Sequence, residues 1–510
     1  MRGGDGGIIW ADFIISFQRP DLPMIQRCLF VIFLVVLSAS CAQHRPMAVE
    51  EWPLQVESEF SQVPSEPGAV PADWFRAFND PVLTGFIETA LRNNFGLKSL
   101  WARLESAALS VDIAGVDRAP QLDLIANVNA QQTDLVTPSG QVVSIDNEGY
   151  SAGVSVSWEV DLWGRIKARQ QFAAANFQAT QAELQESLLL LTASLARVYF
   201  DLQTQTALKQ QLAEQVKIEE ALLKVLYRHS LLGSADSWDG IRAQEQNVLS
   251  LKESLSNAEQ GVEQLQHALA ALLGESPISF EPSIAALEVA DLKAAKTPAE
   301  VQIAMTPERL LKSHPTLKAQ YARVLASDAE VAQALANRLP SLSLSGSYER
   351  ASLDLDQSMD RVITSELLRF SLPIFNAHGR RNVWLQAKAQ LKAEWEAFAE
   401  QYLAALSEVE QQLAAGRHQH NRLAQISERA AYQQGRIEQL RLAYAQGQVD
   451  VQRLLGSLSQ WHRLNQSQLL AQRELLEVRI ALPMAVGGPL DWTRWAPQQD
   501  NNDPVQGRAG

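Results

Sequence analysis

The sequence predicts a mainly α-helical protein whose few β-strands form a membrane β-barrel that several copies of the chain must complete together. Long heptad seams of apolar residues predict the helices, and four short stretches of alternating apolar and polar residues predict the strands. Similarity between residues 220 positions apart predicts that the chain is internally duplicated.

Composition and charge exclude several classes of function. The formal net charge is −14, which disfavours a nucleic-acid partner. The only two cysteines, Cys28 and Cys41, lie near the start, so neither a disulfide framework nor a cysteine-based metal site can be built from them.

Residues 1–40 are predicted to be a signal segment. The stretch MIQRCLFVIFLVVLSASCAQ (24–43) has a cation, an apolar core of about 10 residues and then small residues, which is the order of a secretory signal. The core is shorter than the roughly 20 residues that a membrane-spanning helix needs. Residues 1–23 fit no part of this signal, so we expect the true start at Met24.

Cys41 directly follows LSAS, a context that resembles that of the lipid-carrying cysteine of a bacterial lipoprotein. Such sites usually have a large aliphatic residue three positions earlier, where this chain has Ser38, with Leu37 one further back. Two interpretations stay open: lipidation of Cys41, which we favour, and ordinary cleavage after Ser40. Ala42 is compatible with sorting to the outer membrane.

The first predicted repeat, residues 73–277, follows an extended lead-in (41–72) that is rich in Pro, Ser and Glu. Its pattern is helical from Pro81 to Arg118, and Pro120 ends the helix. Two alternating runs then predict a strand–loop–strand pair with one apolar and one polar face: PQLDLIANVNAQQ (120–132) and YSAGVSVSWEVDLWG (150–164).

Two helices with heptad seams complete this repeat. The first is predicted from about Arg165 to Arg228, and the second ends at Gly274. The first seam steps by four, three, four, three and four through Leu184, Leu188, Leu191, Leu195, Val198 and Leu202. A helix of about 65 residues spans on the order of 100 Å, which no compact soluble domain needs.

The second predicted repeat, residues 306–482, follows a linker (278–305) and precedes a tail (483–510) that we expect to be disordered. Residues 97–124 and 317–344 share ten identities in 28 ungapped positions, which supports duplication. This half supplies its own alternating strand (PSLSLSGSYE), the run TSELLRFSLPIF and two further helices, about 380–445 and 449–481. The seam of the longer helix is Leu391, Trp395, Phe398, Tyr402, Ala405 and Val409.

The length of the predicted strands indicates what they are for. About 9 to 11 residues cross a membrane as a tilted strand, and strands in lipid must close into a barrel of about eight strands or more. Four strands per chain are too few, so several chains must share one barrel, with the apolar faces toward lipid and the polar faces toward a lumen. The alternative is a half-buried hairpin on a soluble helical protein.

The chain resembles the TolC-like outer-membrane efflux proteins, specifically their lipoprotein branch, from about Trp74 to Ala481. Besides the two Pro-then-strand patterns, the resemblance is carried by these segments: DWFRAFNDPVLTGFIETALRNN, SVSWEVDLWGRIKAR, LAALLGESP and FSLPIFNAHGRR. It implies a homotrimer with one 12-stranded barrel in the outer membrane of a Gram-negative bacterium, continued by a helical tunnel through the periplasm. It further implies a periplasmic adaptor, an inner-membrane transporter and export of small molecules such as drugs or metal ions.

Two turns between helices are predicted at the tunnel end. Gly233 and Asp236 in the first half, and Gly447 and Asp450 in the second, suit a helix C-terminus and the N-cap of the next helix. The resemblance makes these turns candidate contacts for the adaptor.

The tunnel aperture is where the chain departs from the resemblance. Family members often have aspartates six and nine residues after the second glycine, where this chain has Arg453 and Gly456, while Asp239 lies six after Gly233. Asp239 and Arg453 are therefore candidates for the aperture, although a solvated helix arginine is the commoner case.

No set of residues predicts catalysis, a cofactor or a metal site, so we expect no enzyme. His418 and His420 are two positions apart in a predicted helix and point to different faces. Trp158 and Trp163 suit either an interfacial aromatic belt or packing at the barrel base. The predicted function is a passive efflux conduit; the alternatives are a type I protein-secretion duct and a structural coiled-coil protein of the envelope.

Overall fold

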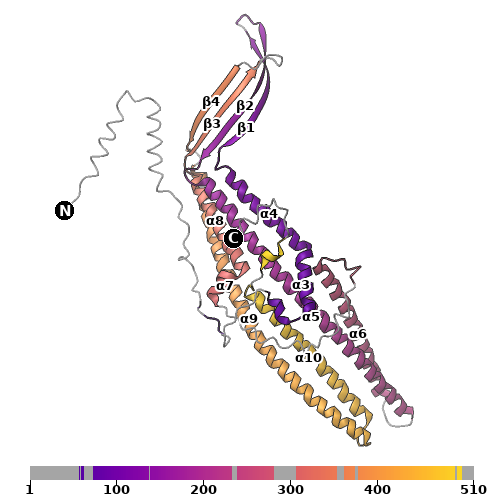
Figure 1. Ribbon diagram of the computed structural model, residues 1–510. Coiled ribbons are helices and arrows are strands. Elements are labelled where there is room, and N and C mark those ends of the chain that lie inside the picture. Colours follow the sequence, from indigo (N-terminus) through magenta and orange to yellow (C-terminus); the bar gives the residue numbers. More distant parts are fainter. Residues whose placement is uncertain are drawn as a thin grey trace, which may run out of the picture. The chain divides into compact units, whose positions relative to one another are not determined.

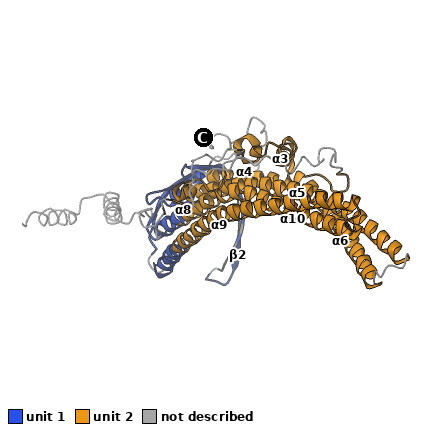
Figure 2. Cartoon of the chain, turned by 90° about the horizontal axis from the view of Figure 1, so that it is seen from below, with its two compact units in different colours: residues 1–50, 114–170, 328–390 blue, residues 51–113, 171–327, 391–510 orange. Residues whose placement is uncertain are grey.

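A computed structural model describes residues 57, 59–61, 73–136, 138–231, 238–280, 306–352, 361–373, 377–488 and 491–496 (Figure 1). The predicted signal segment with Cys41, most of the lead-in, and the turn with Gly233 and Asp236 lie outside these residues. The chain forms two compact units (Figure 2). Unit 1 contains residues 114–170 and 328–390 of the described chain, and unit 2 contains the rest.

Each half of the described chain has the order helix, helix, strand, strand, long helix, helix. The first half contains α3 (Pro81–Asn93), α4 (Phe95–Val116), β1 (Gln121–Val136), β2 (Val142–Val160), α5 (Arg165–Leu231) and α6 (Trp238–Leu273). The second half contains α7 (Pro307–Ser313), α8 (Pro315–Ala336), β3 (Ser341–Ser352), β4 (Arg361–Ser371), α9 (Ala377–Ala445) and α10 (Val451–Ala485). None of the described helices has an apolar stretch long enough to cross a membrane.

The helix predicted over Pro81–Arg118 is two helices, because Asn94 interrupts it. The amide N–H of Asn94 still donates to the carbonyl of Ala90, and the backbone then turns away with ψ 123°. The Asn94 side-chain oxygen accepts from the amide of Leu97, 3.1 Å away, so the same residue caps α4. Asparagine favours caps because its side chain competes for nearby backbone groups.

Unit 1 is built on one antiparallel sheet with the strand order β1-β2-β3-β4. The strand–loop–strand pairs predicted in both halves are confirmed, and the strands have 16, 19, 12 and 11 residues. β2 and β3 join the two halves, with Val154 opposite Tyr348. The outer edges of β1 and β4 have no partner strand among the described residues.

The long helices bury the predicted seams. In α5 the seam leucines Leu184, Leu188, Leu195 and Leu202 are fully buried, and Leu191 and Val198 pack against the same cluster. In α9 all six predicted seam residues are buried. Heptad spacing therefore predicted the packed face of both helices correctly.

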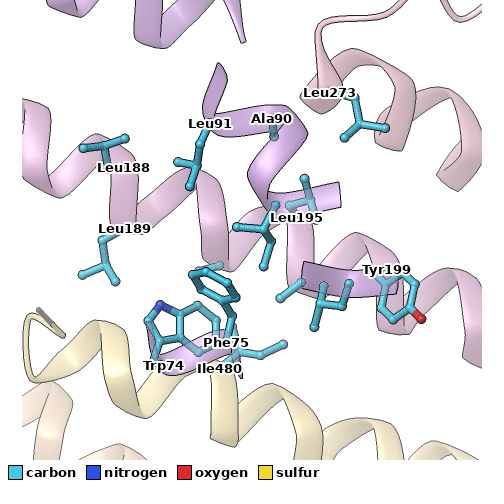
Figure 3. Packing of buried hydrophobic residues seen from close by; sticks show 14 of the residues in the cluster. Trp74, Phe75, Ala90, Leu91, Leu188, Leu189, Leu195, Tyr199, Leu273 and Ile480 are labelled. Carbon is cyan, nitrogen blue, oxygen red and sulfur yellow. The ribbon is translucent and has the colours of Figure 1, made fainter. Parts of the chain in front are cut away.

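The main core of unit 2 lies where α3, α5, α6 and α10 meet (Figure 3). A short 3-10 helix, η4 (Trp74–Phe78), inserts Trp74 and Phe75 into this core. Tyr199 of α5 donates its hydroxyl to Asp80, 2.7 Å away, and Asp80 also caps α3. Burial and this bond raise the pKa of Tyr199 far above its ordinary value, so the hydroxyl stays a donor.

The expectation of a disordered tail from residue 483 is wrong for the described part of that segment. α10 continues to Ala485 with Pro483 inside it, and Trp492–Trp495 form the 3-10 helix η6. Trp495 is only 7% exposed and belongs to the unit 2 core. Burial of this large apolar side chain offsets the entropy lost on ordering the segment, an effect that polar composition alone conceals.

Candidate functional site

The sheet of unit 1 presents one apolar face. Strand register places Leu124, Val154 and Tyr348 beside one another across β1, β2 and β3. On the β1 edge, Leu122, Leu124 and Val128 are 72%, 85% and 72% exposed in the single chain. Apolar side chains exposed in so continuous a row mark a surface that meets lipid or another protein.

The opposite face of the sheet is mostly polar and is joined by side-chain hydrogen bonds. The Ser151 hydroxyl donates to Glu349 at 3.0 Å and accepts from the Asn127 amide at 3.4 Å, so these bonds link β1, β2 and β3. The hydroxyls of Ser347 and Ser365 are 2.9 Å apart and link β3 to β4. The predicted alternation of β1, β2 and β3 is therefore confirmed.

β4 departs from this two-sided pattern. Its Leu367 lies opposite Ser345 and its Ile363 lies opposite Glu349, both on the polar face. Glu366 lies opposite Gly346, on the apolar face. The sequence contains this signal, because TSELLRFS has two adjacent leucines and no strict alternation.

Gly153 marks the closest approach between the two halves of the sheet. A Cβ atom built on Gly153 would lie 2.1 Å from the carbonyl oxygen of Tyr348 and 2.6 Å from Cα of Glu349. Real Cβ contacts are never this short, so only glycine fits between β2 and β3 at this position.

Two tryptophans form hydrogen bonds at the base of the sheet, which is the end where its strands meet the helices. Trp158 donates its indole N–H to the carbonyl of Arg118 at 3.1 Å, and Trp163 donates to the carbonyl of Pro340 at 2.6 Å. Both carbonyls lie between the end of a helix and the start of a strand. These bonds give both tryptophans a packing role at the base, one of the two roles that the sequence left open.

Ion pairs hold the same base in the first half of the chain. Arg165 forms a bidentate pair with Glu159, with N–O distances of 2.9 and 2.7 Å. Arg169 pairs with Asp117 at 2.7 Å. The nearby carboxylates raise the pKa of Arg165, so its charge is held at any physiological pH.

The second-half turn between α9 and α10 has the predicted geometry. Gly447 has φ +70°, and the amide of Gln448 donates to the carbonyl of Ala443 at 2.9 Å, as in a Schellman motif. Asp450 is the N-cap of α10 and accepts from the amide of Arg453 at 2.8 Å.

The two candidate aperture residues are both exposed. Asp239 lies in the first turn of α6 and Arg453 in the first turn of α10. No ion pair joins them within the described residues. The structure thus leaves Arg453 as a solvated helix arginine in the single chain, and its place at an aperture stays a prediction.

A buried polar cluster between α5, α6 and α10 was not predicted. Glu219 is 2% exposed and accepts from the Gln244 amide at 2.6 Å and from the Ser459 hydroxyl. His462 lies one turn further along α10, and burial lowers its pKa. Glu219 lies beyond the predicted seam of α5, and its neighbours in the cluster come from other helices, so the sequence pattern did not single it out.

The described residues contain no group of His, Cys, Asp and Glu that could hold a metal ion. His418 and His420 are both exposed on α9. Among its described residues the chain has a two-faced sheet with unpaired edges at β1 and β4, and long helices, one of which, α9, ends in a capped turn. This combination defines a class of membrane-inserted channel proteins with helical extensions.

The chain matches the family model described as outer membrane efflux protein over residues 86–275 and 306–488, more than half of its length. It therefore belongs to the outer membrane efflux protein family, and both the predicted family and the predicted outer-membrane location are confirmed.

Known relatives agree with this assignment. The chain is 26% identical over 481 residues to the pyoverdine export outer membrane protein OpmQ of Pseudomonas putida, covering 90% of this chain and 97% of OpmQ. It is 24% identical over 311 residues to the cation efflux system protein CusC of Escherichia coli O157:H7, covering 60% and 64%. The solved outer-membrane channel OprN has the same fold, with a TM-score of 0.78 at 23% identity over 90% of this chain and 100% of that chain.

Proposed function

We propose that this protein is the outer-membrane channel of a tripartite efflux pump, a passive conduit through which small molecules leave the cell. The observation that carries the proposal is the four-stranded sheet with one apolar face, one polar face and, among the described residues, two unpaired edges at β1 and β4. In lipid, the N–H and C=O groups of both edges need partners.

The unpaired edges are best satisfied by copies of the same chain. β4 of one copy would pair with β1 of the next, because such a head-to-tail contact, once closed into a ring, leaves no edge. Three copies give twelve strands, above the roughly eight strands at which such barrels begin. The polar face with Asn127, Ser151 and Glu349 would then line the lumen, and the apolar face would meet lipid.

The helical extensions supply the periplasmic part of the conduit. α5 and α9 have 67 and 69 residues, so each spans on the order of 100 Å. We propose that the capped turn at Gly447 and Asp450 contacts a periplasmic adaptor, and that the first-half turn at Gly233 and Asp236 does the same. An inner-membrane transporter would supply the energy.

The proposed anchor and cargo rest on the sequence and the relatives. Cys41 follows a secretory signal and small residues, which supports a lipid-carrying first residue of the mature chain. OpmQ is named for pyoverdine export and CusC for cation efflux, so the relatives carry chemically different small solutes. We propose a small solute as the cargo here as well.

A deletion strain tests this function. Loss of the gene should raise the susceptibility of the strain to small toxic solutes, and plasmid-borne wild-type protein should restore resistance. Protein secretion should not change. A strain that keeps its resistance but no longer secretes a large protein would instead favour the type I secretion duct. A strain that changes neither in resistance nor in protein secretion would favour the structural coiled-coil protein of the envelope.

A further inference from the structure

A face of α9 near the sheet combines basic and apolar side chains. Arg381, Trp384, Leu385 and Lys388 are spaced i, i+3, i+4 and i+7, so they share one side of the helix. Arg381, Leu385 and Lys388 are exposed, and Trp384 is partly buried. Together with Arg338 of the α8–β3 junction, these residues are called the basic face below.

The indole ring of Trp384 lies close to two of the cations of the basic face. The guanidinium carbon of Arg338 and the ammonium nitrogen of Lys388 each lie 5.0 Å from the centre of the indole ring. The ring attracts each cation, but the two like charges repel one another, so a nearby anion would stabilise both. The indole nitrogen of Trp384 is itself buried and has no hydrogen-bond acceptor within the described residues.

No carboxylate of the described residues forms an ion pair with the cations of this basic face. Residues 367–393 contain five Lys and Arg residues and no Asp or Glu, although the whole chain has a net charge of −14. Among the described residues, none of the cations Arg338, Arg381 and Lys388 takes part in an ion pair.

The first half of unit 1 differs at the corresponding place. There Arg165 pairs with Glu159 and Arg169 with Asp117, each at 2.7 Å. Arg165 and Arg169 of the first half are therefore paired inside the chain, whereas Arg338, Arg381 and Lys388 of the second half form no ion pair with another described residue.

The position and the neighbours of the basic face indicate which anion it meets. β4 ends at Ser371 and α9 begins at Ala377, so Arg381 lies ten residues after the end of β4, and Arg338 lies three residues before the start of β3. Val383 and Leu385 of the same helix are exposed apolar residues. Cations, an indole and exposed apolar side chains at the end of a membrane strand suit the boundary between phosphate headgroups and acyl chains.

We propose that the basic face binds the phosphate of an anionic phospholipid in the periplasmic leaflet of the outer membrane. Arg338, Lys388 and Arg381 would contact the phosphate oxygens, and Leu385 would contact the acyl chains. This inference rests on the proposed function, because the headgroups reach α9 only if the strands cross the membrane.

Lipid titration of the purified assembly tests the inference. The delipidated full-length mature protein in neutral detergent is titrated with phosphatidylglycerol, phosphatidylcholine or inorganic phosphate, and bound molecules are counted by native mass spectrometry. The test variant is R338Q/K388Q. The control is R417Q/R436Q, which removes the same charge from two exposed positions further along α9.

Phosphatidylglycerol should bind the wild type and the control equally, and the test variant roughly 25-fold more weakly, since each of the two cations near a membrane surface contributes about fivefold. The charge-conserving K388R should bind within about twofold of the wild type, because either cation can hold a phosphate. Phosphatidylcholine and inorganic phosphate should bind weakly to all four proteins. Circular dichroism and size-exclusion chromatography verify that the variants fold and assemble.

Three results would overturn the lipid site: equal binding of both lipids to the wild type, equal phosphatidylglycerol binding to test and control variants, or displacement of the lipid by inorganic phosphate at equal concentration. Conductance of the same wild-type preparation in a planar bilayer separates the two proposals. A conducting protein without lipid preference refutes the lipid site alone, whereas a non-conducting one refutes the channel on which it rests.

Discussion

The indole N–H of Trp163 lies 2.6 Å from the carbonyl oxygen of Pro340, and this hydrogen bond joins the strand bases of the two halves of the chain. Trp163 follows β2, and Pro340 directly precedes β3, the strand that pairs with β2. The bond therefore fixes the place at which the first-half hairpin meets the second-half hairpin.

Replacement of Trp163 by Phe should weaken this junction. The substitution keeps an aromatic ring but removes the donor, so the carbonyl of Pro340 loses its partner, at a cost of about 1–3 kcal/mol. Thermal unfolding of the sheet, followed by heat-induced mobility change on gels, should show a lower midpoint for W163F. Trp238, which is 67% exposed on α6, supplies the control variant W238F. Equal midpoints for the two variants would show that the bond contributes nothing to the junction.

Gly153 should tolerate no side chain. In G153A the new methyl group meets the backbone of Tyr348 and Glu349, so β2 and β3 must separate or shift register. We expect a large loss of assembled protein in the outer-membrane fraction. Gly149 lies in the same strand, and a Cβ atom added there would meet nothing within 4 Å, so G149A is the matched control. Normal assembly of G153A would contradict the close approach of the two strands.

The stability of unit 2 should depend on the hydrogen bonds that the buried Glu219 carboxylate accepts. In S459A the carboxylate loses one of its hydrogen bonds while it stays buried, which should destabilise the helical unit by about 1–3 kcal/mol. S467A removes an exposed hydroxyl from the same helix and should have little effect. Adding E219Q to S459A should recover part of the loss, because an amide costs less to bury than a charge. Denaturant titration of S459A, E219Q, E219Q/S459A and S467A gives the four differences, and additive effects of E219Q and S459A would mean that the two residues do not interact.

Unit 2 should lose stability in mild acid because of His314. This side chain packs against the end of α10, and its burial lowers the pKa from the ordinary 6.5 to about 4. Between these values the unfolded chain binds a proton that the native chain does not, so the free energy of unfolding falls as the pH falls from 6.5 to 4. The total is on the order of 3 kcal/mol, at 1.36 kcal/mol per pKa unit.

Melting temperatures measured from pH 7 to pH 4.5 check the His314 prediction. H314Q has no titrating ring, so its melting temperature should fall less steeply over this interval than that of the wild type. His418, which is exposed on α9, supplies the control H418Q, and its slope should match the wild type. Parallel curves for the wild type and H314Q would assign the acid sensitivity to other groups.

The affinity for the adaptor should depend on the geometry of the capped turn at Asp450. D450A removes the acceptor of the Arg453 amide and frays the start of α10, at about 1 kcal/mol, which corresponds to roughly fivefold in adaptor affinity if the turn is the contact. D450N keeps a capping oxygen and should bind the adaptor nearly normally. Co-purification with the adaptor gives the comparison, and equal recovery of the wild type, D450A and D450N would remove this turn from the interface.

Periodic patterns in the sequence were enough to predict most of the architecture. The seams of α5 and α9, the alternation of β1 to β3 and the cap at Asp450 are local patterns, and local patterns survive in the folded chain. Trp495 was misjudged because its burial depends on a core formed by distant residues. The Glu219 cluster and the fit of Gly153 were not predicted, since each depends on which helices and strands become neighbours.

The candidate sites likewise divide into those formed by consecutive residues, which could be predicted, and those formed by distant residues, which could not. Gly447 and Asp450 were predictable because a turn is made by consecutive residues, and the structure places them as expected. The basic face escaped prediction because Arg338 and Trp384 are 46 positions apart and meet only in the folded unit. The proposed partners of the β1 and β4 edges belong to other copies of the chain, so no single chain can display them.

The most direct test of the central claim is the conductance of the purified mature protein in a planar lipid bilayer, with its mass in detergent measured in parallel. If the protein is an outer-membrane channel, we expect an assembly of three chains that needs detergent to stay in solution and that forms discrete, ion-conducting pores. A water-soluble single chain that leaves the bilayer insulating would contradict it.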